Sequence, residues 1–438
     1  MSDLSKINGL VDKYFFYGFI ILIPSLVLGP AIPDFIIITS SILFLIFKVK
    51  NFDFKKYKNY IFSFLIFYFL IIISSLLSDY LLWSLKSSLF YLRFFLYFLV
   101  ISYLVSNYIF IFKYLLLIIF VTFVLLFIDT LFQFIFKFNL IGFSVKEGSH
   151  RIASFFNDEY ILGSYILRIF PIILFCISLF KLSKNYQNII VFGVFFITGL
   201  IIILSGDRTP LLLFLIYLSL YFIISDNKKN ISIVFVIFVI FFSSIIFTNS
   251  NIKKRLVDQT ILELGLSDKK PGYFFEKKGL FFFSPLHEKL FITSLNIFDD
   301  NKYFGVGPNN FRHSCKNLKY KAKSKIYYNC YNHPHNIFVQ ILAECGIFIF
   351  LLFFLFYLYL IKYYITFVLK SFSKNLYNLE IGSIFLVISA LVNLFPFAPS
   401  GNFFNNNLSM FNFLCIAIFF SYLKNQNYIN KNINNFIK

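Results

Sequence analysis

Residues 188–224 have the sequence NIIVFGVFFITGLIIILSGDRTPLLLFLIYLSLYFII. Two apolar runs, 188–204 and 209–224, are separated by a short polar turn that carries Asp207 and Arg208. Apolar runs near twenty residues are long enough to cross a hydrocarbon core of roughly 30 Å as helices. The stretch therefore predicts two membrane spans with a polar turn between them at one membrane surface.

The same pattern recurs along all 438 residues, of which 59% are hydrophobic and only 14% are charged. A soluble globular chain is about half apolar and about a quarter charged. We predict membrane spans at 14–29, 31–48, 60–78, 88–106, 109–136, 159–180, 188–204, 209–224, 231–247, 337–360, 378–397 and 407–423. The chain is thus predicted to be an all-α polytopic membrane protein with about twelve transmembrane helices.

The distribution of Lys and Arg orients these spans. With the N-terminus inside, the short inner segments hold about seventeen Lys and Arg residues and the short outer loops about five, which favours cytoplasmic termini. The net charge of +20 reflects this bias and does not call for a nucleic-acid partner. On this topology, 1–247 carries the first nine spans and 248–336 forms one large, partly helical periplasmic loop. The last three spans occupy 337–424, and 425–438 is a cytoplasmic tail.

Arginine is scarce, with six in the chain, and its planar guanidinium can grip phosphate through two hydrogen bonds. Arg208 falls at the outer membrane boundary, and Arg151 follows His150 in an outer loop. The alternatives are an interfacial Arg208 paired with Asp207, and an Arg151 that is an ordinary solvated charge. Arg168 lies inside the predicted span 159–180, where a charge indicates a cavity or a partner on a neighbouring helix.

All five histidines fall outside the membrane in this topology. Two of them lie in the sequence Asn332-His333-Pro334-His335-Asn336. Pro334 favours an extended conformation for His333, and residues two apart in an extended segment share a side. We therefore expect the rings of His333 and His335 to face one pocket. A third metal ligand at a recognisable spacing is missing, so no metal site is predicted.

The helix predicted after this segment carries a polar stripe. Asn336 is a good N-cap residue, and Asn336, Gln340 and Glu344 recur at every fourth position of an otherwise apolar run. In a membrane such a stripe normally faces the bundle interior or a wet cavity. The alternative is hydrogen bonding between helices without any chemistry.

The predicted outer loop contains a turn and a cysteine pair. The sequence Gly305-Val306-Gly307-Pro308 predicts a tight turn that lets the backbone approach closely, and Arg312 follows it. Cys315 and Cys330 lie in the same loop, so a disulfide is expected if the loop is in an oxidising compartment. Such a bond closes a loop of about sixteen residues and contributes on the order of 3 kcal/mol in the chain-entropy model. The alternative is two free thiols.

Four of these patches resemble the O-antigen ligase and polymerase family of bacterial surface-glycan assembly. They are residues 205–210, the turn at 305–308, the His-Pro-His-Asn run leading to Glu344 and Gly346, and Arg151 ahead of 155–159. Members of this family transfer a glycan from undecaprenyl diphosphate on the periplasmic side of the inner membrane. Ligases use lipid A–core as the acceptor, and polymerases use another repeat unit. The resemblance implies that neither a metal ion nor another cofactor takes part.

By this resemblance, His335 is the base that takes the proton of the acceptor hydroxyl. Arg208 and Arg312, with Arg151 as an addition, hold the diphosphate, and His333, Asn336 and Glu344 support the site. Arginines at a membrane surface can stabilise such a leaving group, and histidine has a pKa suited to a base. The alternatives are a polymerase of the same family, protein O-glycosylation by the same chemistry, and a lipid-glycan flippase or transporter. A flippase would line a path through the midplane with charges, where only Arg168 lies.

Overall fold

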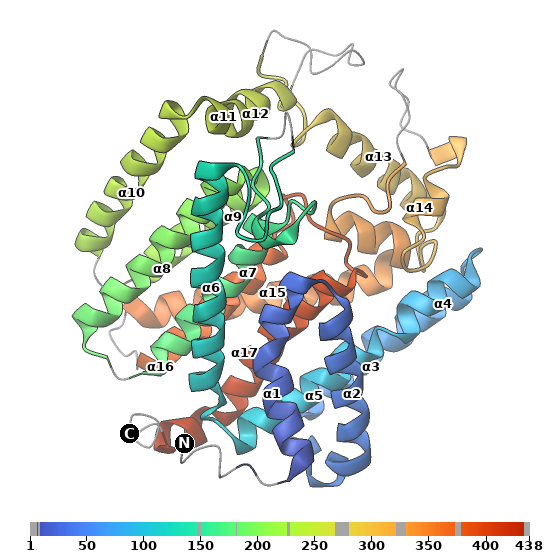
Figure 1. Cartoon of the computed structure of the whole chain (residues 1–438). Coiled ribbons are helices and arrows are strands. Elements are labelled where there is room, and N and C mark those ends of the chain that lie inside the picture. Colours follow the sequence, from blue (N-terminus) through green and yellow to red (C-terminus); the bar gives the residue numbers. More distant parts are fainter. Residues whose placement is uncertain are drawn as a thin grey trace.

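The computed structural model describes residues 7, 9–146, 150–180, 182–225, 228–267, 280–320, 330–372 and 378–432. These residues form a bundle of helices without a β-strand, and an isolated bridge joins Phe138 to Ser144. Figure 1 shows the long helices side by side, with the short helices of the later chain gathered at one end. The all-α prediction is confirmed for the part of the chain described.

The bounds of the helices follow in chain order. They are α1 (Leu10–Ser25), η2 (Leu26–Leu28), α2 (Ala31–Phe47), η3 (Val49–Asn51), α3 (Phe54–Leu76), α4 (Leu81–Leu89), α5 (Leu92–Asn107), α6 (Ile111–Phe136), η4 (Ser154–Phe156), α7 (Leu162–Ser178), α8 (Lys184–Ser205) and α9 (Arg208–Ile224). The later ones are α10 (Lys228–Thr248), α11 (Ser250–Lys253), η5 (Lys254–Asp258), α12 (Gln259–Glu263), α13 (Pro285–Asp300), α14 (Phe311–Ser314), η6 (Leu318–Tyr320), α15 (Ile337–Phe372), α16 (Asn378–Asn393) and α17 (Asn406–Asn432).

Seven of the described helices are long and apolar enough to cross a membrane. An eighth candidate is the pair formed by Phe235–Thr248 and Ser250–Glu263, which bends by 100° at its break. The shorter apolar helices are Ala31–Phe47, Leu162–Ser178, Arg208–Ile224 and Gly382–Asn393. Each of the twelve predicted ranges overlaps one of these helices. The multi-pass architecture is therefore shown, whereas the count of twelve spans and the periplasmic loop stay predictions.

Helix α7 forms the centre of the bundle, because it packs against α6, α8, α9 and α16 and almost all of its side chains are buried. Helix α17 packs along α5 beside it. Helix α3 lies at the outside, and large apolar side chains such as Phe62 and Phe69 stay exposed on it. A helix buried all round and outer helices with exposed apolar faces are typical of a bundle in lipid.

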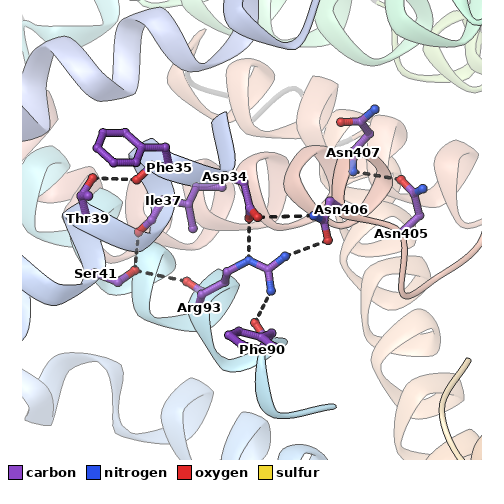
Figure 2. Close-up of polar contacts among 10 residues, drawn as sticks. All are labelled: Asp34, Phe35, Ile37, Thr39, Ser41, Phe90, Arg93, Asn405, Asn406 and Asn407. Atoms are coloured by element: carbon purple, nitrogen blue, oxygen red, sulfur yellow. Dashed lines mark hydrogen bonds and ion pairs between the residues drawn. The ribbon is translucent and has the colours of Figure 1, made fainter. Parts of the chain in front are cut away.

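Arg93, a charged residue among the apolar helices, donates hydrogen bonds to partners from three segments of the chain (Figure 2). Arg93 of α5 donates through Nε to Asp34 of α2 at 2.7 Å and through Nη2 to Asn406 of α17 at 2.7 Å. Its Nη1 also donates to the carbonyl of Phe90. The guanidinium therefore ties the beginnings of α2, α5 and α17 together. This pairing accounts for an arginine near the start of a predicted span.

Two helices extend beyond their predicted ends. Helix α15 continues from the predicted end at 360 to Phe372, and Tyr364 in this extension donates to the carbonyl of Leu220 at 2.7 Å. Helix α17 continues through the predicted start of the tail to Asn432. Asn425 in this part donates to Tyr57 of α3 at 3.1 Å. Contacts with neighbouring helices stabilise both ends, and such contacts are invisible to a hydropathy pattern.

The range 248–336, predicted as a partly helical loop, is helical in much of its described part. It contains α11, η5, α12, α13 and α14, which lie together at one end of the bundle in Figure 1. Helix α13 packs along α15. A small apolar core of Leu290, Ile297, Phe311, Cys315 and Ala343 holds α13, α14 and α15 together. This core fixes the start of α13 against the segment that precedes α15.

Candidate functional site

The turn between α8 and α9 places the first group of site residues. Gly206 ends α8 in the left-handed region, with φ 70°, and Arg208 is the first residue of α9. A Cβ at position 206 would approach the backbone carbonyl of His150 too closely, so the loop before α7 packs directly on this turn. The backbone N–H of Ile152 donates to Ser205 at 3.3 Å, which fixes the neighbouring Arg151 beside the turn.

Two ion pairs form around this turn. Arg208 donates through Nη2 to Glu263 of α12 at 2.9 Å, and both side chains are about a quarter exposed. Asp207 pairs instead with Arg151 and also accepts the backbone N–H of Gly163 at 3.0 Å. The alternative in which Asp207 binds Arg208 therefore does not occur in this structure. Arg151 is likewise not an ordinary solvated charge, because its partner carboxylate is buried.

A third arginine joins the group. Arg255 of η5 donates to the carbonyl of Gly206 at 3.3 Å and to Gln259. The positive charges of Arg208 and Arg151 act on its guanidinium. Three of the chain's six arginines thus lie within electrostatic reach of one another. Asp207 and Glu263 pair with two of them, so the group keeps a net positive charge, which favours an anionic ligand.

Three histidines form a cluster next to these arginines. The ring centroids of His333 and His335 lie 4.1 Å apart, and those of His335 and His287 lie 5.6 Å apart. His287 stands in the first turn of α13, whereas His333 and His335 precede α15. His335 has φ 56°, a left-handed conformation that is uncommon for a residue with a side chain. The structure thus brings the two rings expected in one pocket together and adds a third.

The histidine rings are neutral near pH 7. Burial lowers the pKa of His335. Burial and the nearby His335 lower the pKa of His333 to about 3, and the charge of Arg312 acts in the same direction. Burial, His335 and the charge of Arg208 lower the pKa of His287 to about 4. A neutral imidazole can accept a proton, as a general base must.

Arg312 lies over Trp83 of α4, and its charge acts on the cluster through His333. Its Nη2 donates to Asn309 at 2.8 Å, and its guanidinium carbon lies 5.3 Å from the ring centroid of Trp83. His313 stacks on Tyr80 beside it, with ring centroids 4.4 Å apart. Because the charges of Arg208 and Arg312 act on His287 and His333 respectively, the cluster has an arginine near each of these two rings.

The polar stripe of α15 holds loops in place. Asn336 accepts the backbone N–H groups of residues 338 and 339, as an N-cap does. Gln340 donates to Glu344 at 2.9 Å and to Asn402 at 2.7 Å. Glu344 accepts the backbone N–H groups of Asn309 and Phe311, both at 2.9 Å. The stripe is therefore a scaffold that holds the loops around the site. This role is close to the alternative prediction, in which the stripe makes structural hydrogen bonds and takes no part in chemistry.

The turn at 305–307 fits into a break in α15. Gly346 interrupts that helix with φ 78°, and the freed carbonyls of Ala343 and Glu344 accept from Val306 at 3.1 Å and Gly307 at 2.8 Å. A Cβ at Gly305 would overlap the backbone of Glu344. Further along the same loop a disulfide joins Cys315 to Cys330, with Cα atoms 5.6 Å apart. The turn was expected to let the backbone approach closely, and in the structure it approaches the backbone of α15.

We expect Gly305→Ala to destabilise the protein. The substitution adds a left-handed strain of roughly 1–2 kcal/mol and an overpacking cost of about 1–3 kcal/mol. Thermal unfolding of the purified protein measures the effect. Gly142→Ala is the control, because Gly142 also has a positive φ, of 95°, but has open space around its Cβ position. Equal melting temperatures for the two variants would contradict the close packing of the turn at 305–307 against α15.

A comparison with protein families bears on what this site does. Residues 193–354 match the family model described as O-antigen ligase. Over these residues the chain is similar to the O-antigen ligase family. The resemblance inferred from the four sequence patches is thereby confirmed, and no curated protein matches the chain.

The O-antigen ligase match begins in α8 and ends within α15. It includes Arg208, Arg255, His287, Arg312 and His335, whereas Arg151 lies ahead of it. The family covers O-antigen ligases and polymerases, so a glycan-transferring membrane enzyme is supported at this level.

Sequence reasoning missed three members of the site: Arg255, Glu263 and His287. The scarcity of Arg and His was a usable signal for two of them, since both types are rare in this chain. Glu263 had no comparable signal, because its role depends on the bend that returns α12 to the start of α9.

Arg168 of α7 donates to the carbonyl of Ser164 at 2.7 Å, and no ion pair is found for it among the described residues.

Proposed function

We propose that this protein transfers an O-antigen glycan from undecaprenyl diphosphate to lipid A–core on the periplasmic face of the inner membrane. The observation that carries the proposal is a cluster of partly buried histidines that includes His335, with the charge of Arg208 acting on its member His287. A glycosyl diphosphate needs a cationic grip on its leaving group and a base for the acceptor, and these residues supply both.

The donor diphosphate binds between Arg208 and the histidines. The guanidinium of Arg208 presents several N–H donors, and a planar fork suits two phosphate oxygens at once. In the free protein, Glu263 holds this guanidinium. The incoming diphosphate therefore competes with Glu263 for Arg208, while Arg255 adds charge from the neighbouring turn. The lipid tail of the donor extends along the apolar surface of the bundle.

Transfer then takes place at the anomeric carbon of the glycan. The acceptor hydroxyl forms a bond to this carbon as the bond from the carbon to the phosphate oxygen breaks. The proton of the hydroxyl passes to the neutral ring of His335, and undecaprenyl diphosphate leaves with the electron pair of the broken bond. Arg312 and Arg151 add positive charge around the site, and we propose that no metal ion or other cofactor takes part.

Complementation of a bacterial strain that lacks its own ligase tests this function. We expect long-chain lipopolysaccharide on a gel when this protein is expressed, with lipid-linked glycan measured in parallel. Glycan that lengthens on undecaprenyl diphosphate without reaching lipid A–core would favour the polymerase of the same family. Movement of lipid-linked glycan across the membrane without any transfer would favour a flippase.

The pH dependence of transfer provides a further prediction. His335 acts as a base only when it is unprotonated, and burial lowers its pKa below the ordinary value of 6.5. The value of kcat/KM is therefore expected to stay constant near neutral pH and to fall only as the pH drops through this lowered pKa. A profile from pH 4 to 8 with purified donor and acceptor measures it. An acid limb with its midpoint above 6.5 would contradict the assignment.

A further inference from the structure

We propose that His287 is a further catalytic residue, whose Nε2–H donates a hydrogen bond to the phosphate oxygen that leaves the anomeric carbon. This inference rests on the proposed glycosyl transfer and adds a residue that the sequence did not single out. It is carried by the position of His287, by the hydrogen bond that fixes its ring, and by its neighbours.

The first turn of α13 fixes the backbone of His287. Ser284 is the N-cap of this helix, and its Oγ accepts the backbone N–H of His287 at 3.2 Å. The same oxygen lies 2.6 Å from Nδ1 of the His287 ring. Ring and backbone are therefore both held by one buried hydroxyl.

This arrangement determines which ring nitrogen carries the hydrogen. The Oγ of Ser284 already accepts a backbone N–H, so its own hydrogen needs an acceptor, and a buried hydroxyl without one is costly. The unprotonated Nδ1 of His287 is the acceptor at hydrogen-bonding distance. In a neutral imidazole with a bare Nδ1, the hydrogen is on Nε2. The assignment of the tautomer thus follows from the hydrogen bonds.

The neighbours of His287 place this donor beside the reaction. Its ring faces that of the base His335, with centroids 5.6 Å apart and the ring planes at 71°. The charge of Arg208 also acts on it. In the proposed complex, Arg208 holds the diphosphate, and the acceptor hydroxyl that attacks the glycan is hydrogen-bonded to His335. The oxygen that departs from the glycan then lies between Arg208 and His335. His287 contacts the ring of His335 and lies in the field of Arg208, so it is the donor we assign to this oxygen.

The hydrogen bond strengthens as the reaction proceeds. When the bond between the anomeric carbon and the phosphate oxygen breaks, the electron pair stays on that oxygen, and its negative charge grows. A fixed N–H donor aimed at this charge stabilises the transition state more than the ground state. His287 keeps its proton throughout, because the acceptor's proton goes to His335. Its pKa of about 4 keeps the ring neutral at the working pH.

Three substitutions test this role. His287→Gln keeps an N–H donor near the position of Nε2, whereas His287→Asn places its amide near that of Nδ1, and His287→Ala removes both. We expect kcat to fall about 100-fold in the Asn and Ala variants, with little change in KM, since one transition-state donor is lost. The Gln variant should retain most of the wild-type kcat. His313→Ala, which removes a histidine stacked on Tyr80, is the control and should match the wild type.

The outcomes separate this inference from the proposed function. An active wild type with unchanged kcat in the Asn and Ala variants would overturn the role of His287 and leave the transfer reaction in place. A wild type that transfers no glycan would overturn the proposed function. In that case ¹⁵N NMR of the histidines in nanodiscs, with His287 assigned by subtraction of the Ala variant, still tests the donor. A neutral Nε2–H ring at pH 7 is expected, and an Nδ1–H or charged ring would overturn it.

Discussion

Replacing His335 with alanine is expected to lower glycan transfer by a factor of roughly 10²–10⁴, the usual contribution of a positioned general base. Its ring is the one that faces both other histidines, and burial keeps it in the neutral form that accepts a proton. The measurement is the rate of transfer by purified protein from a lipid diphosphate donor, at saturating donor and acceptor. We expect the lower rate of transfer to appear as a lower kcat.

The unusual backbone of His335 calls for a second variant. With φ 56°, alanine is strained at this position, whereas asparagine tolerates the left-handed region. His335→Asn therefore keeps the conformation of the segment but removes the base, and its activity should be as low as that of the Ala variant. An active Asn variant beside an inactive Ala variant would mean that the backbone, and not the base, is what transfer requires.

Replacing Arg208 has the second large effect. We expect Arg208→Ala to lower kcat/KM by about 10²–10³, because the developing charge on the diphosphate loses its main electrostatic partner. Arg208→Lys keeps the charge but loses the planar fork, so an intermediate loss is expected. Steady-state kinetics against donor concentration measure both variants.

Two control variants make the test of Arg208 specific. Lys319→Ala removes an exposed cation of η6, paired with Asp300, and should leave transfer unchanged. Arg151→Ala is expected to harm folding instead, because it leaves the buried Asp207 without its cation, at a cost of roughly 3–5 kcal/mol. An Arg208→Ala variant with full activity would remove Arg208 from the mechanism.

The sequence predicted those parts of the molecule that depend on local pattern. Apolar runs located the helices, because lipid selects for them along each span. The N-cap at Asn336 follows from the chemistry of a few adjacent residues. The rings of His333 and His335 meet as expected, but the segment bends at His333 and His335 is left-handed, so the extended conformation expected there is not the one observed.

The partners of these residues could not be predicted in the same way. Glu263 reaches Arg208 because the chain bends by 100° between α10 and α11. His287 reaches His335 because a small apolar core holds α13 on α15. The break at Gly346 exists because a distant turn supplies the hydrogen bonds that the helix gives up. Each depends on contacts between segments far apart in sequence, for which periodicity carries no information.

The link between Arg93, Asp34 and Asn406 also bears on how the chain is made. Asp34 leaves the ribosome before Arg93, whereas Asn406 follows more than three hundred residues later. When α5 enters the membrane, its arginine can thus be neutralised by a carboxylate already in place, which lowers the cost of inserting a charge. The amide of Asn406 is added by the last helix. Completion of this three-way link therefore marks the end of assembly, and a ribosome stalled before α17 would leave the guanidinium one partner short.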